Sequence, residues 1–394
     1  MKKKLLFLMP SMFIGGAERS LIALLDSIDY EKYEINLFLY RHEGEFLSFI
    51  PKEVKILPSI DAYETFDVPI KQLLFSKKFI YGLCRVWSKF LYRINSKLKN
   101  IGVWAAMQYI SRSLLPVLPE IPGEYDVAIS FLGIPDVLAY RVNAKKRIAW
   151  NHTDYTILGP DYYYDQQIYK KIDYIVSVSD QCTNQFIKVY PQLKDKAITI
   201  ENLLSNGFIM KQAEKEIDDF FCEKDYIKIL SVGRFSEAKN FDNVPNICSR
   251  LLSLGLKVKW FLIGYGGDEV LIRKKIKEEH MEQNVIILGK KINPYPYIKQ
   301  CDVYIQPSRY EGKCVSVIEA QILNKPVIIT DYATAGKQLT NGVDGIIVGM
   351  NNQECAEGIA KVLRDRNLQD ILIANTKETD YSNRQELEKL SRLL

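Results

Sequence analysis

Short apolar runs alternate with segments of helical periodicity along most of the chain. The run at residues 4–9 is followed by residues 16–26, where apolar positions recur three and four residues apart, as on one face of a helix. Later runs predict further strands in the first half, at residues 35–40, 54–57, 125–130, 147–150 and 174–178. Strands that alternate with helices in this way are typical of a parallel sheet covered by crossover helices.

The same alternation starts again in the second half, after an interruption. The pattern breaks at residues 200–206, and a charged stretch at 211–225 leads to a new strand at 227–232. Further strands are predicted at 257–263, 285–288, 303–306, 327–330 and 345–348. Because 394 residues exceed what one hydrophobic core usually supports, we expect an α/β protein with two Rossmann-like domains. They should comprise residues 1–205 and 206–376, and a closing helix should cover residues 377–394.

Composition excludes several classes of protein. Hydrophobic residues make up 47% of the chain and charged residues 26%, as in ordinary globular proteins. The basic, apolar start imitates a signal peptide, but its apolar run is short and ends at Pro10, so we interpret it as a strand. No segment holds the about 18 uncharged apolar residues that a membrane span needs. The seven cysteines lack C-x-x-C spacing, which favours free thiols in a reducing cytoplasm.

Two cations follow the first strand of the second half. This strand leads to Gly233, and Arg234 and Lys239 lie in the turn before the next helix. Parallel sheets bind ligands at the carboxyl ends of their strands. There the planar fork of Arg and the point charge of Lys can hold a diphosphate and stabilise it as a leaving group without a metal. The alternative is a pair of solvated surface charges.

Two carboxylates follow the strand predicted at residues 303–306. Glu311 lies in the loop after that strand, and Glu319 lies about two turns into the next helix. Ionised carboxylates accept hydrogen bonds from vicinal hydroxyls, so Glu311 can face a sugar and Glu319 can reach a ribose. Between them, the backbone N–H groups of Lys313, Cys314 and Val315 lie at a helix N-terminus, where they can bind phosphate. The alternative is one surface carboxylate and one half-buried carboxylate in an ordinary helix.

Together these motifs resemble the retaining glycosyltransferases of family 4. These enzymes have the GT-B fold, in which two Rossmann-like domains face each other across a cleft. The motifs that carry the resemblance are Gly15-Gly16-Ala17-Glu18-Arg19, Gly233-Arg234 with Lys239-Asn240, Glu311-Gly312 with Glu319-Ala320, and Lys325-Pro326-Val327.

The resemblance implies a role for each motif. Arg234 and Lys239 would hold the donor diphosphate, Glu311 the donor sugar and Glu319 the ribose. The donor site would also include Gly15, Gly16, Gly233, Gly312, Lys313, Cys314 and Val315. The loop that contains Gly15 and Gly16 would approach the phosphates or the acceptor, since glycine has no Cβ to obstruct a close contact.

His152 completes the expected catalytic set with Glu311, Arg234 and Lys239. It follows the strand at residues 147–150, at the place where the family presents a histidine to the donor sugar. A lone histidine is more often structural, and that alternative stays open. The chain departs from the family after Glu311-Gly312, where residues 313–316 read Lys-Cys-Val-Ser instead of an aromatic residue and a Gly or Pro. The shape of the sugar pocket is therefore not predicted.

The resemblance implies transfer of a hexose, with retention, from a nucleotide diphosphate-sugar to a glycan or a lipid-linked acceptor. We expect a UDP-sugar donor, no cofactor, no metal, and a part in surface polysaccharide synthesis. The alternatives are a sugar-nucleotide epimerase of similar architecture and a non-enzymatic nucleotide-binding module. A dehydrogenase is disfavoured because Pro10-Ser-Met-Phe-Ile-Gly-Gly16 follows the first strand, and not a G-x-G-x-x-G turn.

The net charge of +5 is unevenly distributed. No acidic residue occurs between Asp67 and Glu120, and residues 71–112 contain nine Lys and Arg side chains. Within this segment Leu83, Trp87, Phe90, Ile94 and Leu98 recur at helical spacing, and so do Arg85, Lys89, Arg93 and Lys97. Such a basic amphipathic helix can lie on an anionic bilayer. We therefore expect a cytoplasmic protein, peripheral at the inner face of the membrane. Alternatively, the apolar face packs on the first sheet; no nucleic-acid motif accompanies the charge.

Overall fold

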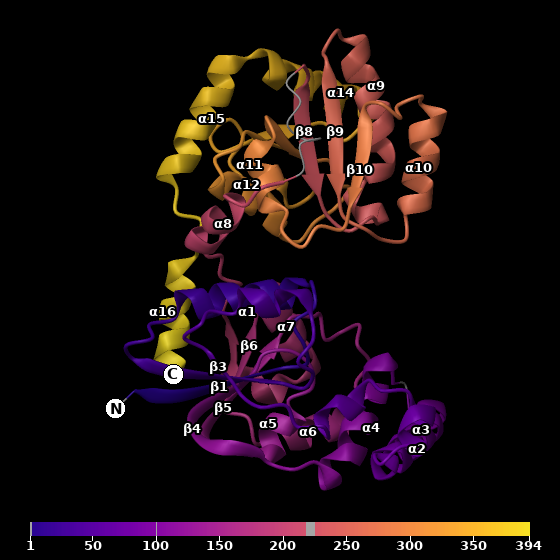
Figure 1. Ribbon diagram of the computed structural model, residues 1–394, viewed down its shortest axis with the longest axis vertical. Coiled ribbons are helices and arrows are strands. Elements are labelled where there is room, and N and C mark those ends of the chain that lie inside the picture. Colours follow the sequence, from indigo (N-terminus) through magenta and orange to yellow (C-terminus); the bar gives the residue numbers. More distant parts are fainter. Residues whose placement is uncertain (1, 100, 218–224) are drawn as a thin grey trace. The chain divides into compact units, whose positions relative to one another are not determined.

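The computed structural model describes residues 2–99, 101–217 and 225–394, and the chain divides into two compact units (Figure 1). The first unit comprises Met1–Leu204 and Asn383–Leu394, and the second comprises Ser205–Ser382. Each unit has its own hydrophobic core and its own parallel sheet. Residues 218–224 of the charged stretch predicted at 211–225 lie outside the described residues.

The first unit is built on a seven-stranded sheet in the order β3-β2-β1-β4-β5-β6-β7, and its strand pairs are parallel. Leu5 to Met9 of β1 are all buried, as expected for a strand covered on both faces. The predicted strands are confirmed, and β7 is an additional strand too short to give a pattern. The strands are β1 (Lys3–Met9), β2 (Tyr33–Leu39), β3 (Lys55–Ile56), β4 (Ile121–Ser130), β5 (Val142–Asn151), β6 (Tyr174–Ser177) and β7 (Ala197–Thr199).

Helices cover this sheet, and three of them lie between β3 and β4. The helices that follow single strands are α1 (Gly16–Ser27), α5 (Asp136–Arg141), α6 (Tyr162–Tyr169) and α7 (Asp180–Val189). The inserted helices are α2 (Ile70–Leu74), α3 (Phe79–Leu98) and α4 (Val103–Leu114), followed by the short helix η3 (Leu115–Val117). The basic segment predicted at residues 71–112 therefore lies mostly in this helical insert.

Buried hydrogen bonds fasten the insert to the rest of the first unit. The Gln108 side chain on α4 donates to Asp165 and accepts from the Asp161 N–H at 2.7 Å. The Tyr109 hydroxyl donates to Asp161 at 2.5 Å, and the Tyr190 hydroxyl donates to Asp165 at 2.6 Å. Burial raises the pKa of Asp165 to about 7. Because buried polar groups are costly when unpaired, these bonds fix the position of α4.

The second unit has a six-stranded parallel sheet in the order β10-β9-β8-β11-β12-β13. Its strands, which confirm those predicted, are β8 (Ile227–Val232), β9 (Val258–Ile263), β10 (Val285–Gly289), β11 (Val303–Gln306), β12 (Val327–Thr330) and β13 (Ile346–Val348). Its helices include α8 (Asn206–Ala213), α9 (Val244–Ser253), α10 (Glu269–Glu278), α11 (Tyr295–Gln300), α12 (Val315–Ile322), α13 (Ala335–Gln338), α14 (Asn352–Arg364) and α15 (Arg366–Glu378).

Residues 377–394 are shared between two helices. Helix α15 ends at Glu378, and α16 (Arg384–Leu393) follows after Asn383, whose φ of 52° is left-handed. Helix α16 is part of the first unit. There the Glu386 carboxylate accepts from the Glu201 N–H at 3.0 Å, and the Lys3 ammonium donates to the Leu394 carbonyl at 2.9 Å. The end of the chain thus packs against strands and loops of the first unit.

A glycine-rich loop after β9 supports the loop after β8. Gly264 has a φ of 152°, and a Cβ placed there would lie 1.9 Å from the Gly233 carbonyl oxygen. A Cβ on Gly266, with a φ of 157°, would lie 2.3 Å from the Phe235 carbonyl oxygen. The Phe235 N–H also donates to the Tyr265 carbonyl at 2.9 Å. The two loops therefore touch through their backbones, which leaves no room for side chains.

Replacing Gly264 should destabilise the protein. Gly264→Ala adds a backbone clash and a strained φ, and we expect it to lower the free energy of unfolding by about 2 kcal/mol or more. Gly267→Ala is the matched control, since a Cβ there has nothing within 4 Å and its φ is not positive. Urea denaturation measures the unfolding free energy of both variants. Equally small losses in the two variants would contradict the close contact between Gly264 and the Gly233 carbonyl.

Candidate active site

Two loops meet at the carboxyl edge of the second sheet. One follows β8 and contains Gly233, Arg234 and Lys239; the other follows β11 and contains Glu311. Strands β8 and β11 are parallel neighbours, so their carboxyl ends and the loops that follow them emerge side by side. This edge is where α/β sheets bind ligands.

An ion pair joins the two loops. The Lys239 ammonium lies 2.5 Å from Glu311 Oε1, and both side chains are largely buried, at 17% and 11% exposure. Glu311 Oε1 also accepts from the Ser308 hydroxyl at 2.6 Å, and the Lys239 ammonium lies 3.6 Å from Cys314 Sγ. Burial alone would lower the pKa of Lys239, but Cys314 and Glu311 outweigh it and raise the pKa. A cation and a carboxylate from distant parts of the sequence are thus held together.

Backbone geometry around Lys239 fixes this arrangement. A Cβ on Gly233 would lie 3.1 Å from Lys239 Cε, so a larger residue would displace the lysine. Asn240 is left-handed, with a φ of 59°, and its side-chain amide donates to the Pro307 carbonyl at 2.8 Å. Arg309 donates to both Asp242 oxygens at 2.9 and 2.7 Å. These contacts tie the loop after β8 to the loop after β11.

The N-terminus of α12 lies beside the ion pair. Cys314 occupies the N-cap position, and its backbone N–H donates to the Gln338 side chain at 2.7 Å. The Thr334 hydroxyl donates to the Glu311 carbonyl at 2.7 Å. The helix itself begins at Val315, and the first N–H groups of a helix have no acceptor within the helix. This end of α12 is therefore suited to an anion.

The structure places the other predicted residues of this unit in different environments. Gly312 and Lys313 are exposed in the loop before α12, and Arg234 is exposed and makes no ion pair with a described residue. Glu319 is fully buried, and the Tyr295 hydroxyl donates to its Oε1 at 2.9 Å. Of the predicted residues, Lys239, Glu311 and Cys314 are thus in contact, Arg234 is exposed, and Glu319 is buried.

Ser308, Thr334 and Gln338 contact the predicted site residues but were not predicted. Ser308 follows β11 closely, and Thr334 and Gln338 follow β12, which is the next strand in the sheet. Their position after neighbouring parallel strands is the signal that would have identified them. The residue type alone gives no such signal, because Ser, Thr and Gln are common everywhere.

In the first unit, the loop of Gly15 and Gly16 connects β1 to α1. Gly15 is extended, with a φ of −157°, and precedes the first turn of α1. A Cβ on Gly15 would lie 2.1 Å from Glu18 Oε2, whereas a Cβ on Gly16 would meet nothing within 4 Å. Burial raises the pKa of Glu18. Gly15 therefore makes room for the Glu18 carboxylate, and Gly16 leaves open space at the start of α1.

His152 follows β5 at the carboxyl edge of the first sheet. Its Nε2 lies 2.9 Å from the Phe131 carbonyl oxygen, and its ring packs 5.0 Å from the Phe131 ring. Nε2 must carry the proton to donate to this carbonyl, which leaves Nδ1 as an acceptor. Burial lowers the pKa of His152 to about 4. The ring is therefore neutral at pH 7 and can form hydrogen bonds without carrying charge.

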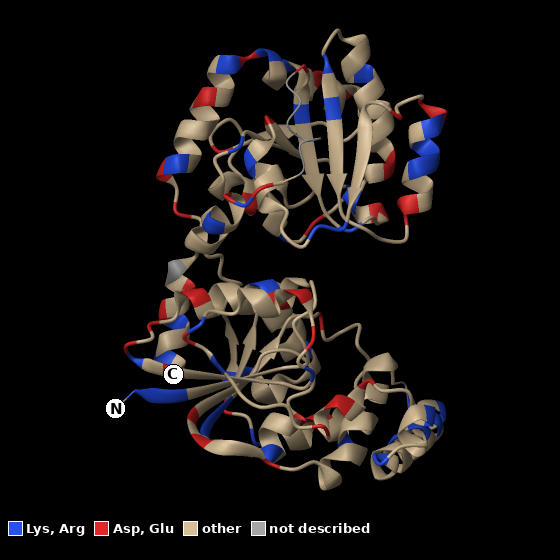
Figure 2. Ribbon diagram, in the orientation of Figure 1, with Lys and Arg blue, Asp and Glu red and all other residues tan. Residues whose placement is uncertain are grey.

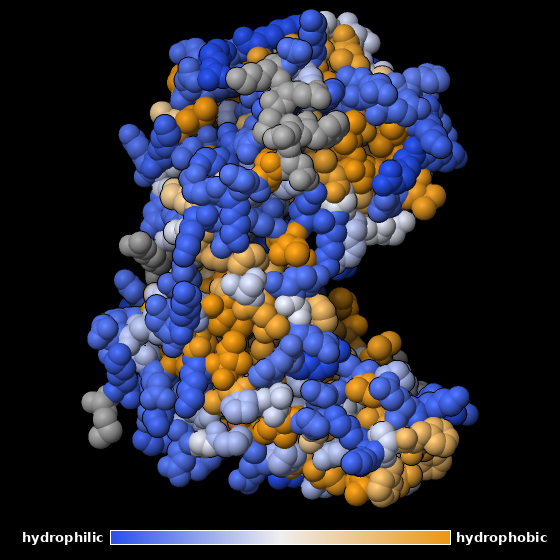
Figure 3. Space-filling view, in the orientation of Figure 1, coloured by the Kyte–Doolittle hydropathy of each residue, from blue (hydrophilic) through white to orange (hydrophobic). Residues whose placement is uncertain are grey.

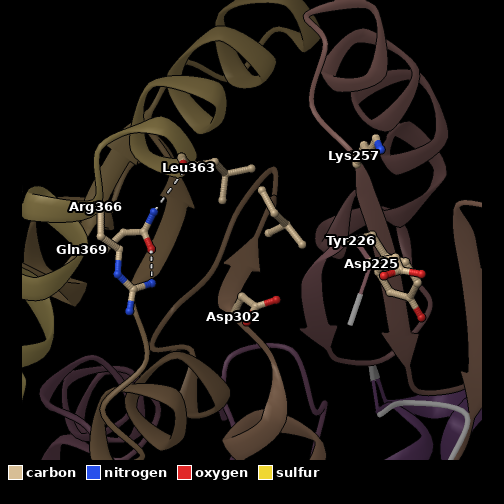
Figure 4. Close-up of a pocket in the computed structure, with 8 residues that line it drawn as sticks. Asp225, Tyr226, Lys257, Asp302, Leu363, Arg366 and Gln369 are labelled. Carbon is tan, nitrogen blue, oxygen red and sulfur yellow. Dashed lines mark hydrogen bonds between the residues drawn. The ribbon is translucent and has the colours of Figure 1, made fainter. Parts of the chain in front are cut away.

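A pocket of about 440 Å³ lies elsewhere in the second unit (Figure 4). Asp225, Lys257 and Asp302 line it from the residues just before β8, β9 and β11, and Arg366 and Gln369 line it from α15. The pocket is thus at the amino ends of the strands. Because ligands of parallel sheets bind at the carboxyl ends, it is distinct from the site of Lys239 and Glu311.

Comparison with known proteins finds glycosyltransferases. The family model described as "Glycosyl transferases group 1" matches residues 212–379. The N-acetylgalactosamine-N,N'-diacetylbacillosaminyl-diphospho-undecaprenol 4-alpha-N-acetylgalactosaminyltransferase of Campylobacter jejuni is 28% identical over 44% of each chain. The capsular polysaccharide biosynthesis glycosyltransferase CapM of Staphylococcus aureus is 28% identical over 50% of this chain and 57% of that protein. The chain spans about half the length of the curated relatives it matches.

Solved structures are similar over the whole chain. A glycosyltransferase from Rickettsia africae has a TM-score of 0.64 and 14% identity, covering 100% of this chain and 97% of that one. HepE from Anabaena, in complex with UDP, has a TM-score of 0.60 and 16% identity, covering 100% of both chains. At sequence identities of 14% and 16%, this structural similarity establishes the fold and nothing more. The predicted α/β fold of two Rossmann-like domains, the GT-B class, is thus confirmed.

The low pKa of His152 predicts a pH-dependent stability. The unfolded chain binds a proton at an ordinary histidine pKa of about 6.5, whereas folded His152 does so at about 4. Its contribution to stability is therefore present above pH 6.5 and is lost as the pH falls toward 4. Relative to His152→Gln, the wild type should lose about 3 kcal/mol of unfolding free energy over this range.

Urea denaturation at several pH values measures the unfolding free energy of the wild type and of His152→Gln. The difference between the two proteins isolates the contribution of His152 from that of the other titrating groups. His42→Gln, at an exposed histidine, is the matched substitution control. Parallel pH profiles of the wild type and His152→Gln would disprove the assignment.

Proposed function

We propose that this chain is a retaining glycosyltransferase of family 4 that transfers a hexose from a UDP-sugar to a glycan or lipid-linked acceptor in surface polysaccharide synthesis. The observation that carries the proposal is the convergence of Lys239, Glu311 and the N-terminus of α12 at one edge of the second sheet. All three lie within residues 212–379, which the glycosyltransferase family model matches. The names of the relatives, which include a transferase for an undecaprenol-linked acceptor, support the acceptor class.

The donor diphosphate would bind between Lys239, Arg234 and the first N–H groups of α12. These groups offer a buried cation, an exposed guanidinium and a helix N-terminus, each suited to phosphate oxygens. They stabilise the negative charge that develops as the diphosphate leaves, which is the task that a metal ion performs in other enzymes. Transfer would therefore need no metal.

Glu311 and Glu319 would bind the hydroxyl groups of the donor. Glu311 lies beside Lys239 and accepts from Ser308, so its carboxylate is already oriented when a sugar hydroxyl arrives. Glu319 lies deeper, where Tyr295 orients one oxygen, and would accept from the ribose. His152 would offer a neutral ring to the sugar. The family resemblance implies attack and departure on the same face of the sugar, and the leaving phosphate would then help to remove the acceptor proton.

The proposal includes docking on an anionic membrane, because α3 exposes its apolar side. Gly82 and Ser88 of α3 are buried, whereas Trp87 is 54% and Leu98 77% exposed. The alternative in which this apolar face packs on the first sheet is therefore wrong, because most of the large apolar side chains of α3 are exposed. In Figure 3 apolar surface gathers at the lower right, where Figure 1 labels α2 and α3. The other large apolar residues exposed on α3 are Phe79, Ile80, Leu83, Val86, Phe90 and Ile94.

Three of the four predicted cations flank this surface. Lys89, Arg93 and Lys97 are exposed, and Figure 2 shows basic residues along α3. Arg85 is different, because its guanidinium donates to the Thr65 and Phe66 carbonyls, both at 2.6 Å. Burial lowers the pKa of Arg85, and its hydrogen bonds hold α3 to the short helix η2 (Tyr63–Phe66). No helix among the described residues is long and apolar enough to span a bilayer.

Loss of the site cations should slow transfer. Lys239→Met removes the buried cation at the leaving group, so we expect kcat with a UDP-sugar to fall on the order of 100-fold. Arg234→Ala should lower both kcat and donor affinity. Arg273, which pairs with Glu269 on α10, is the control, since Arg273→Ala should leave turnover unchanged. Transfer from radiolabelled UDP-sugars measures these effects, and product analysis separates transfer from epimerisation.

Chelation tests the same mechanism independently. EDTA should have little effect on the rate, because the cations stabilise the leaving diphosphate. A strict requirement for Mg²⁺ or Mn²⁺ would contradict it.

The α3 surface should bind anionic vesicles. Replacing Lys89, Arg93 and Lys97 together by Gln should weaken vesicle binding on the order of 100-fold, since each cation contributes about 1 kcal/mol. Trp87→Ser should weaken it further by removing apolar burial. The matched control replaces three basic residues of α10, Lys274, Lys275 and Lys277, by Gln. Co-sedimentation at low salt measures binding, and a wild-type protein that stays in the supernatant would disprove membrane docking.

A further inference from the structure

A pocket of about 410 Å³ lies on the helical side of the first unit. It is formed by the end of α4, the following η3 helix, α5 and α6, which are close together in Figure 1. Its volume is within the range of roughly 300 to 1,000 Å³ that is typical of small-ligand pockets. Helix η3 precedes β4 and α5 leads directly into β5, so the pocket is toward the amino ends of these strands. His152, at the carboxyl edge, does not line it.

Cations line and flank this pocket without acidic partners. Arg112 is exposed, and its guanidinium lies 5.6 Å from the centre of the Tyr164 ring. Arg141 is oriented by a hydrogen bond of 2.9 Å from its Nε to the Leu115 carbonyl. Next to the pocket, the Lys171 ammonium lies 4.0 Å from the Tyr140 ring. Within the described parts of the chain, no carboxylate forms an ion pair with any of these three cations.

Carboxylates near the pocket are covered. Asp136 is only 1% exposed and accepts from the Tyr164 hydroxyl at 3.0 Å, so it lies beneath that ring. Asp165 is also 1% exposed and is held by Gln108 and Tyr190. The surface that faces a ligand therefore carries positive charge only.

Aromatic side chains supply the rest of the lining. Tyr163 is 66% exposed and Tyr140 is 38% exposed, and both border the pocket together with Tyr164 and Gln167. A tyrosine ring packs its face against the C–H groups of a sugar, and its hydroxyl can hydrogen-bond to the sugar hydroxyls. A guanidinium fork matches the geometry of a carboxylate or a phosphate. Tyrosine rings and arginine guanidinium groups together are suited to bind a sugar that carries an anionic group.

We propose that this pocket binds an anionic sugar residue, with a carboxylate or a phosphate group, in a part of the acceptor glycan remote from the reacting hydroxyl. The identification of that glycan as the acceptor rests on the proposed function. The pocket would retain a growing, negatively charged polysaccharide while its end is extended. It would also favour acidic over neutral acceptors.

Binding to the full-length protein tests the proposal, with three probes in isothermal titration calorimetry. A hyaluronan tetrasaccharide carries carboxylates, glucose 1-phosphate carries a phosphate, and maltotetraose is neutral. We expect one or both anionic probes to bind, and Arg112→Ala and Tyr163→Ala each to weaken that binding about tenfold or more, as loss of a charged hydrogen bond or a stacked ring does. The anionic probe that binds identifies the group recognised.

Controls separate this proposal from the proposed function. Arg112 and Tyr163 are exposed, so both variants should keep the melting temperature of the wild type, and Arg273→Ala should keep its affinity for the probe. Turnover of the UDP-sugar without the anionic glycan should be unchanged in both variants. The proposal is overturned if neither anionic probe binds, if maltotetraose binds equally well, or if the variants bind like the wild type. Probe binding without any UDP-sugar turnover would instead refute the proposed function and leave the pocket assignment standing.

Discussion

Parallel pairing of the strands is the constraint on which the rest of this structure depends. In both sheets the described strand pairs are parallel, so each connection must cross over from the carboxyl edge of the sheet to its amino edge, where the next strand begins. Loops that follow neighbouring strands therefore emerge together whatever their separation in sequence. Lys239 and Glu311 are 72 residues apart and yet form an ion pair.

The ion pair of Lys239 and Glu311 contributes little to stability. Removing two charges from water costs free energy, which their attraction in the interior only partly offsets. The chain surrounds the pair with Ser308, Cys314 and a loop fastened through Asn240, so the charges are oriented before any ligand binds. In the proposed mechanism, groups held in place in this way would need no reorganisation as charge develops on the leaving diphosphate.

In the helical insert, the side chains that hold it to the first unit are different from those left on its surface. Buried polar groups, centred on Gln108, Asp161 and Asp165, hold α4 to the first unit. The large apolar and basic side chains of α3 are left on the outside, where they are costly unless they meet a partner. The membrane surface and the anionic sugar pocket proposed above would both use side chains that the fold itself does not need.

The sequence by itself determined most of the fold of each unit. Strands such as β8 and β11 were predicted to the residue, because each is a mostly apolar run that stops at a turn residue, Gly233 or Pro307. Gly233, Lys239, Glu311 and Glu319 could be placed after strands or on a helix, since the position of a residue along its element is local information. The orientation of α3 could not be predicted from its own residues. Its apolar stripe was evident, but the side that faces the protein depends on contacts with other segments, such as those of Arg85 with the Thr65 and Phe66 carbonyls.

Only the tertiary structure decided the contacts between distant residues. It showed that Lys239 is paired with Glu311, that Arg85 holds a loop while Lys89 is exposed, and that Arg112 shares a pocket with Tyr163. It also placed α16 in the first unit, although the residues before it belong to the second. Periodicity reports only which face of an element is apolar. Pairing, burial and charge compensation are properties of several elements packed together, so one segment of sequence cannot determine them.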